Sequence, residues 1–229
     1  MAVSWPCRLS VEEYAAAGAA VVVPRPDCPE CGRPMIFAGS YWRRVRHGGG
    51  EHRVLIRQAR CEPCGDGHAL LPDFVLHRRR DSASAVGAAL LGAVDPTADP
   101  AARRLYAGVP ARTVRSWRAR FCSHAAILTS AFAALTVTLG SHDPRLPLDR
   151  GATTMAIAAT GAVWLAASHR RPGQIPTPWR LVSIITGGTL LAPRVDMPLL
   201  PRQLPRPNSG KASRSAGHRA RGTNHGPPP

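Results

Sequence analysis

Acidic residues are scarce in this chain. Its 229 residues include 14 Asp and Glu against 30 Lys and Arg, which gives a formal net charge of +16. Such an excess favours a polyanionic partner. All of the cations except Lys211 are Arg, a preference typical of a GC-rich genome. Coding bias accounts for the choice of Arg over Lys, but it does not account for the charge.

The sequence also lacks the residue patterns of common enzymes. After residue 125 the only acids are Asp143, Asp149 and Asp196, whereas metal-dependent strand transfer needs converging carboxylates. No catalytic triad, phosphate-binding glycine loop or dinucleotide fingerprint is present. We therefore expect neither catalysis nor a small-molecule substrate.

The first fourteen residues have no apolar segment of the kind that signal peptides carry. Two later apolar stretches, Ala125–Leu139 and Gly151–Ala167, are shorter than the roughly 18–20 residues that span a bilayer. We expect a cytoplasmic, nucleoid-associated protein with no membrane segment. Paired cysteines in a reducing compartment are typically metal ligands.

Four of the six cysteines form two Cys-x-x-Cys-Gly units that begin at Cys28 and Cys61. Two such units can hold one tetrahedral zinc ion at Zn–S distances of about 2.3 Å, and the glycine lets the backbone turn back at positive φ. The predicted ligands are Cys28, Cys31, Cys61 and Cys64. Four sulfurs leave no open position, so one structural Zn²⁺ is expected. Buried or disulfide-bonded cysteines are the alternative, and His68 could replace one ligand, although a solvated or capping histidine is favoured.

Between the cysteine pairs the sequence is typical of a β-hairpin with a turn at Gly48–Gly50. Aromatic residues Tyr41 and Trp42 interleave with arginines there, a composition suited to nucleic-acid contact. The candidate contacts are Arg43, Arg44 and Arg46. Alternatively, the aromatic residues cover the zinc core and the arginines form a solvated face.

A helix-turn-helix is predicted after the hairpin, with a short helix over Ala101–Ala107 and a longer one over Ala111–Ser123. Val114, Trp117 and Phe121 share one face of the longer helix and define its buried stripe. The predicted DNA contacts are Arg112, Arg115 and Ser116 facing the major groove, with Arg103, Arg118 and Arg120 at phosphates. Thr113 is a further predicted DNA-binding residue of the same helix. An ordinary helical hairpin is the alternative, and Arg103 and Arg104 lie where this motif usually has an apolar residue and an alanine.

These elements predict an α+β fold: a small N-terminal zinc-ribbon β-hairpin domain followed by an all-α helix-turn-helix region and further Ala-rich helices. The expected divisions are a helix and strand lead-in at 1–23, the zinc ribbon at 24–77, the helix-turn-helix unit at 78–124, an Ala-rich helical region at 125–192, and a disordered basic tail at 193–229.

Several segments resemble an actinobacterial family of unknown function that is often found near mobile elements. They include Trp5-Pro6-Cys7, Pro24–Cys31, Pro34–Phe37, His68–Pro72 and Thr113–Trp117. That family looks like a zinc ribbon followed by a transposase-type helix-turn-helix. The resemblance implies binding of double-stranded DNA, as a transposon-associated accessory factor or a transcriptional regulator. Two alternatives remain: a protein-interaction module that binds a transposase, a transcription partner or a second copy, and, less favoured, a complete transposase.

Overall fold

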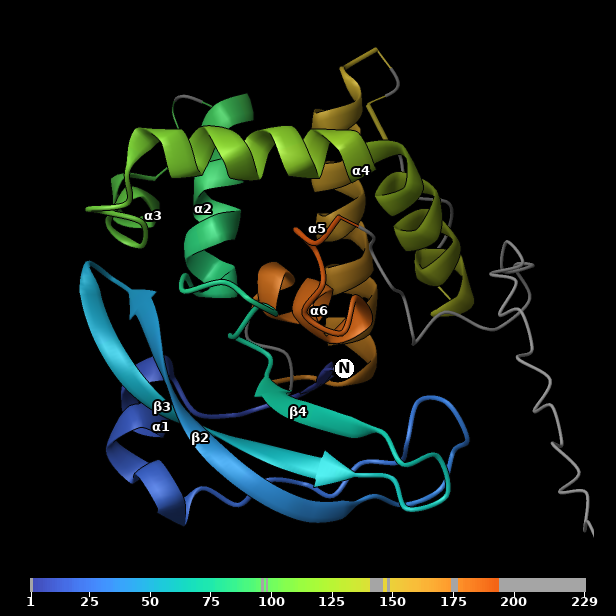
Figure 1. Ribbon diagram of the computed structural model, residues 1–229. Coiled ribbons are helices and arrows are strands. Elements are labelled where there is room, and N and C mark those ends of the chain that lie inside the picture. Colours follow the sequence, from blue (N-terminus) through green and yellow to red (C-terminus); the bar gives the residue numbers. More distant parts are fainter. Residues whose placement is uncertain are drawn as a thin grey trace, which may run out of the picture.

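The fold is α+β, with a four-stranded sheet near the N-terminus and helices after it. The computed structural model describes residues 2–95, 97, 99–140, 146–147, 149–173 and 177–193. Figure 1 shows α2 to α6 gathered on one side of the sheet, with α1 below them against the strands. The predicted basic tail, apart from Pro193, lies outside the described residues.

The sheet has the strand order β1-β4-β3-β2 and consists of Ala2–Trp5 (β1), Ile36–His47 (β2), Gly50–Arg60 (β3) and Gly67–Pro72 (β4). The predicted hairpin is present as β2 and β3, which pair antiparallel. Strand β1 was not predicted. It pairs parallel with β4, so the extreme N-terminus closes one edge of the sheet and β2 forms the other.

The first helix covers the sheet beside the hairpin. It spans Val11–Ala17 (α1) and continues as one 3-10 turn. A capping box begins α1, since Ser10 Oγ accepts from the Glu13 backbone and the Glu13 carboxylate accepts from the Ser10 backbone. Tyr14 is fully buried and donates its hydroxyl to the Leu55 carbonyl at 2.8 Å. The predicted lead-in therefore belongs to the core of the sheet.

The helical layer consists of Ala83–Val94 (α2), Pro100–Arg104 (α3), Ala111–Thr138 (α4), Ala152–Arg170 (α5) and Pro178–Ile185 (α6). Ser82 caps α2, because its hydroxyl accepts from the Ala85 backbone. The predicted stripe of Val114, Trp117 and Phe121 is buried, and Trp179 packs edge-on against Phe121. The segment that contains Trp179 is the helix α6.

Helix α4 does not end at Ser123. It runs on to Thr138 and absorbs the first Ala-rich stretch, because Ala125, Leu128 and Phe132 continue its buried face at helical spacing. A division at 124/125 would therefore cut a continuous helix. By length and composition alone α4 could cross a membrane, whereas the apolar stretch Ala125–Leu139 alone was expected to be too short. A core helix of a soluble protein passes the same test.

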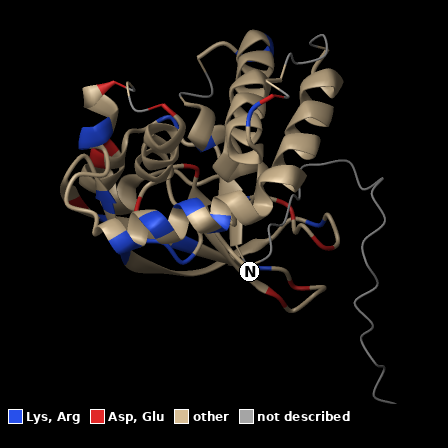
Figure 2. Cartoon of the chain, turned by 90° about the horizontal axis from the view of Figure 1, so that it is seen from above, with Lys and Arg blue, Asp and Glu red and all other residues tan. Residues whose placement is uncertain are grey.

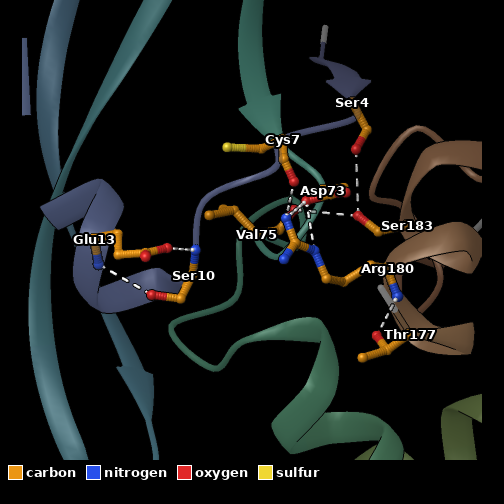
Figure 3. A network of polar contacts seen from close by, with 9 residues as sticks. All are labelled: Ser4, Cys7, Ser10, Glu13, Asp73, Val75, Thr177, Arg180 and Ser183. Carbon is orange, nitrogen blue, oxygen red and sulfur yellow. Dashed lines mark hydrogen bonds and ion pairs between the residues drawn. The ribbon is translucent and has the colours of Figure 1, made fainter. Parts of the chain in front are cut away.

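Helix α6 joins the helical layer to the sheet (Figure 3). Arg180 donates from Nε to Asp73 Oδ1 at 2.8 Å and also reaches the Cys7 carbonyl. Ser183 contacts Ser4 at 3.4 Å. Asp73 follows β4, while Ser4 lies in β1. The two layers have separate apolar cores, and this polar joint connects them.

Candidate metal centre and basic surfaces

The two Cys-x-x-Cys-Gly units adopt the same backbone turn. Gly32 N–H donates to the Cys28 carbonyl and Gly65 N–H to the Cys61 carbonyl, both at 2.8 Å. The glycines have φ of 71° and 72°, a conformation that disfavours any residue with a Cβ. Each turn thus brings its second cysteine back toward the first, as the spacing predicts.

The four cysteine sulfurs converge, although the two pairs lie before β2 and after β3. All four lie within 4.8 Å of one another, and the Cys31 and Cys61 sulfurs are 3.5 Å apart. Antiparallel pairing of β2 with β3 brings the two turns together, since Ile36 faces Arg60. Cys28 and Cys61 are buried, whereas Cys31 and Cys64 are exposed. This group could hold a metal ion through all four predicted ligands.

The protonation of these thiols fits a shared site. The backbone N–H of Arg33 lowers the pKa of the Cys31 thiol to about 7, with further help from the neighbouring sulfurs. Hydrogen bonding with the Cys31 sulfur raises the pKa of Cys64 instead. Thiols this close to one another therefore shift the pKa values of Cys31 and Cys64 in opposite directions.

His68 is neither a solvated side chain nor a member of the cysteine group. It lies in β4 with 1% of its surface exposed, and neither ring nitrogen has a hydrogen-bond partner among the residues that the structure describes. Burial lowers its pKa, so the neutral ring is favoured. Among the described residues, only the four cysteines form a group of three or more ligands within reach of one ion.

The arginines predicted to contact DNA from the hairpin have different roles in the structure. Arg43 donates to the backbone carbonyls of Leu76 and Arg79, and Arg46 forms an ion pair with Asp81 at 2.9 Å. Both side chains hold the segment after β4 against β2. Arg44 is exposed and pairs with Glu51 at 3.0 Å.

Tyr41 and Trp42 do not cover the cysteine site. They are 39% and 49% exposed and lie outside the buried cluster that contains Cys28 and Cys61. The guanidinium carbon of Arg53 lies 5.0 Å from the centre of the Trp42 ring. The alternative in which these aromatic side chains form a lid over the metal is therefore wrong.

The first half of α4 carries most of the other predicted contacts. Figure 2 shows basic residues recurring along it. Arg112, Arg115 and Ser116 are exposed, whereas Thr113 is half-buried. Arg118 donates from Nη2 to the Ala89 carbonyl of α2 at 3.2 Å, so its guanidinium serves helix packing. Arg120 is half-buried on the same helix, and Arg103 is exposed on α3.

One basic surface was missed in the sequence interpretation. A hollow of about 540 Å³, here called the arginine groove, is lined by Tyr41, Trp42, Arg43, Arg44, Ala69, His77, Arg78, Arg79 and Arg80. The Arg78-Arg79-Arg80 run was visible in the sequence, but nothing there indicated that it folds against β2. Burial, and next the charge of Arg120 on α4, lower the pKa of Arg79, so the groove lies close to α4.

These features define an α+β protein with a four-cysteine candidate metal centre and basic surfaces on two layers. A model of a protein family described as a domain of unknown function, DUF6431, matches residues 28–117. The matched segment includes all four cysteines and the first turns of α4. Comparison with curated proteins and with solved structures finds no match.

Proposed function

We propose that this protein binds double-stranded DNA, with one structural zinc ion in the sheet and a helix-turn-helix formed by α3, the following turn and α4. Its role would be that of a transposon-associated accessory factor or a transcriptional regulator in the cytoplasm. The observation that carries the proposal is the division of α4 into a buried stripe and an exposed basic face.

The donor set supports zinc as the metal. Tetrahedral Zn–S bonds of about 2.3 Å place sulfurs about 3.8 Å apart. The observed separations, 3.5 Å for Cys31 and Cys61 and at most 4.8 Å overall, need only small adjustments to reach that arrangement. Cys28, Cys31, Cys61 and Cys64 would all be ligands, so the ion would stabilise the sheet and take no part in chemistry.

The arrangement of α4 supports DNA recognition. Val114, Trp117 and Phe121 anchor the helix to the layer beneath it, and α3 and α4 both pack on α2. The glycine at 108, with φ of 77°, permits the sharp turn before α4. Arg112 and Arg115 then point away from the core near the helix N-terminus, where a recognition helix contacts base edges. We assign Arg118 to holding α4 against α2 and not to a phosphate contact, since the Ala89 carbonyl already accepts its hydrogen bonds.

Selection of bound duplexes from a random library tests the proposal. Sequence preference should weaken in Arg112→Ala and Arg115→Ala, by about 1–3 kcal/mol if each side chain makes a bidentate base contact. Arg171→Ala is the matched control, because it removes one exposed charge outside α4. Absence of duplex binding by the metal-loaded protein at low salt would overturn the proposal.

A second function, docking to a protein partner, is supported by exposed apolar side chains on the helical layer. Ile127 and Val137 on α4 and Leu165 on α5 are each more than half exposed. Retention of a partner after nuclease treatment would favour this function over DNA binding. A transposase or transcription protein is the class of partner that would fit it, and self-association is the other possibility.

A further inference from the structure

The arginine groove lies between the edge strand β2 and the segment that leads from β4 to α2. Its volume of about 540 Å³ falls within the range of about 300–1,000 Å³ that ligand sites occupy. Successive side chains of a strand point to opposite faces of the sheet. Tyr41 and Arg43 therefore share the face of the groove, whereas Trp42 and Arg44 point to the other face. The cationic side chains that a ligand in the groove can meet are those of Arg43 and of residues 77–80.

The positive charge of the groove is not balanced by acidic side chains. In the described part of the chain no acidic residue lines it. The carboxylates of the adjoining segments have other partners, since Asp81 pairs with Arg46 at 2.9 Å and Glu51 pairs with Arg44 at 3.0 Å. A hollow lined by charge of one sign concentrates ions of the opposite sign, because its low-dielectric walls focus the field. The groove is therefore suited to an anion.

The cations of the groove lie close enough to influence one another. Burial lowers the pKa of His77, and the charges of Arg78 and Arg43 lower it further. Burial likewise lowers the pKa of Arg43, although the neighbouring Tyr41 opposes that shift. Both effects reflect positive charge that is held away from water or beside other positive charge. A bound anion would relieve the repulsion and replace the lost hydration.

The inner wall of the groove is fixed by hydrogen bonds to backbone carbonyls. Arg43 donates from Nη2 to the carbonyl of Leu76 at 2.7 Å and to that of Arg79. Arg79 in turn donates from Nη2 to the Leu191 carbonyl at 2.7 Å. A guanidinium group carries five N–H donors, so both side chains keep donors for a ligand. The shape of the wall is set before any ligand arrives, which lowers the entropy cost of binding.

Arg78 and Arg80 supply further charge at the rim. Both are exposed, and within the described residues their side chains have no hydrogen bond or ion pair. Arg78 has φ of 56°, the one positive φ among described residues other than glycine. Strained backbone of this kind is found preferentially at functional sites. The rim thus offers two guanidinium groups that no described side chain uses.

We propose that the arginine groove binds a small molecule that carries a diphosphate group. Arg43 and Arg79 hold one phosphate from the inner wall. Arg78 and Arg80 hold the other at the rim, because the forked N–H groups of arginine match the oxygens of phosphate. Tyr41, on the same face as Arg43, can donate its hydroxyl to the inner phosphate.

A compact anion fits this groove better than the backbone of a DNA duplex does. Arg43 is half-buried inside the hollow, where a small molecule can reach it. The phosphates of a duplex are fixed on the outside of a broad rod, so they would meet the rim alone. The groove is thus a second site with its own ligand, and its occupation does not rest on the duplex recognition proposed for α4.

Isothermal titration calorimetry with inorganic diphosphate tests the proposal on the metal-loaded full chain. Sulfate, titrated at the same ionic strength, measures general attraction of anions. Diphosphate should bind at least about tenfold more tightly, because it alone can engage the inner wall and the rim together. Equal affinity for the two anions, or binding of neither, would overturn the proposal.

Variants assign the binding to the groove. Arg78→Ala combined with Arg80→Ala should weaken diphosphate binding at least about tenfold, since both rim donors are lost while the inner wall stays intact. The matched control is Arg44→Ala combined with Arg53→Ala, which removes two exposed charges from the opposite face of the sheet.

The control variant should weaken diphosphate binding by no more than about twofold, because solvent screens charges that do not touch the ligand. Equal losses in the two double variants would show that net charge alone attracts the anion, which contradicts the proposal. Capture of the metal by diphosphate is recognised by heat that persists in the rim variant, whose four cysteines are unchanged. That result would also contradict binding in the groove.

A last comparison separates this site from α4. Arg112→Ala should leave diphosphate affinity unchanged, and the rim variant should leave the sequence preference for duplexes unchanged. If the rim variant weakens duplex binding as much as Arg112→Ala does while diphosphate is not preferred over sulfate, the groove serves the DNA backbone and the proposal is wrong. Failure of duplex binding with diphosphate binding intact would overturn only the function proposed for α4.

Discussion

The sheet and the helical layer differ in the features that stabilise each of them. The sheet closes around a small apolar core, and at one end four cysteines bring the approach to β2 and the exit from β3 together. The helical layer has the larger core and no such group among its described residues. The sheet is therefore expected to depend on a bound metal and the helices on packing, a contrast that mutation can test in each layer separately.

Loss of the metal should have the largest effect, and it should fall on the sheet. With zinc bound, as we propose, Cys31→Ser removes one ligand of a site whose apparent binding free energy is of the order of 10–16 kcal/mol. Hydrogen exchange should then show β2 and β3 unprotected while α4 and α5 stay protected. A chelator should reproduce the result in the unmodified protein.

Cys122→Ser is the matched control, because Cys122 is exposed on α4 and lies outside the cysteine group. It should leave metal content and exchange unchanged. If α4 and α5 lose protection together with β2 and β3, the two layers unfold as one unit and the contrast fails.

The cysteine group could be predicted because short segments of the sequence determine its geometry. A Cys-x-x-Cys-Gly unit contains its own turn, and the hairpin between the two units determines that they meet. The capping box before α1 and the cap of α2 were predictable for the same reason. The first half of α4 was recognised from the spacing of its buried stripe.

The remaining features depend on contacts between distant residues. Strand β1 pairs with β4 across more than sixty positions, and no pattern in Ala2–Trp5 indicates that partner. The sequence predicts that Arg43 and Arg46 contact DNA. In the structure the segment from Leu76 to Asp81 folds against both side chains. Alanine-rich sequence also gives no signal for a boundary at Ser123, because Ala continues a helix readily.

The joint between the layers should give the next largest effect. Arg180→Met leaves Asp73 buried without its cation, and loss of one member of a buried pair costs about 3–5 kcal/mol. Burial raises the pKa of Asp73 to about 6 from an ordinary 3.8, although Arg180 lowers it. This carboxyl group therefore favours folding more at low pH, and that contribution is lost as pH rises from 3.8 to about 6.

The loss of stability in Arg180→Met depends on the ionisation of Asp73. It should be largest well above pH 6, where Asp73 is ionised, and it should become smaller as the pH falls through 6. Urea denaturation across that range measures it. The double variant Asp73→Asn with Arg180→Met should be insensitive to pH in that window; a loss of equal size at every pH would show that Arg180 acts by packing alone.

Close packing of α2 on α6 should give the smallest effect, confined to the helical layer. A Cβ built on Gly87 would lie 2.1 Å from the Trp179 indole, so Gly87→Ala forces the two helices apart. Overpacking of this kind typically costs about 1–3 kcal/mol, which exceeds the gain of about 1 kcal/mol expected for alanine in a helix. Thermal unfolding should detect a net loss, with metal content unchanged.

Gly161→Ala provides the matched control within the same layer. Gly161 lies inside α5, and a Cβ there would have no atom within 4 Å. Only the backbone effect remains, so this variant should be more stable by about 0.5–1 kcal/mol. If both glycine variants shift stability in the same direction, the contact with Trp179 does not exclude a side chain at position 87. The helical layer is then more loosely packed than its buried core indicates.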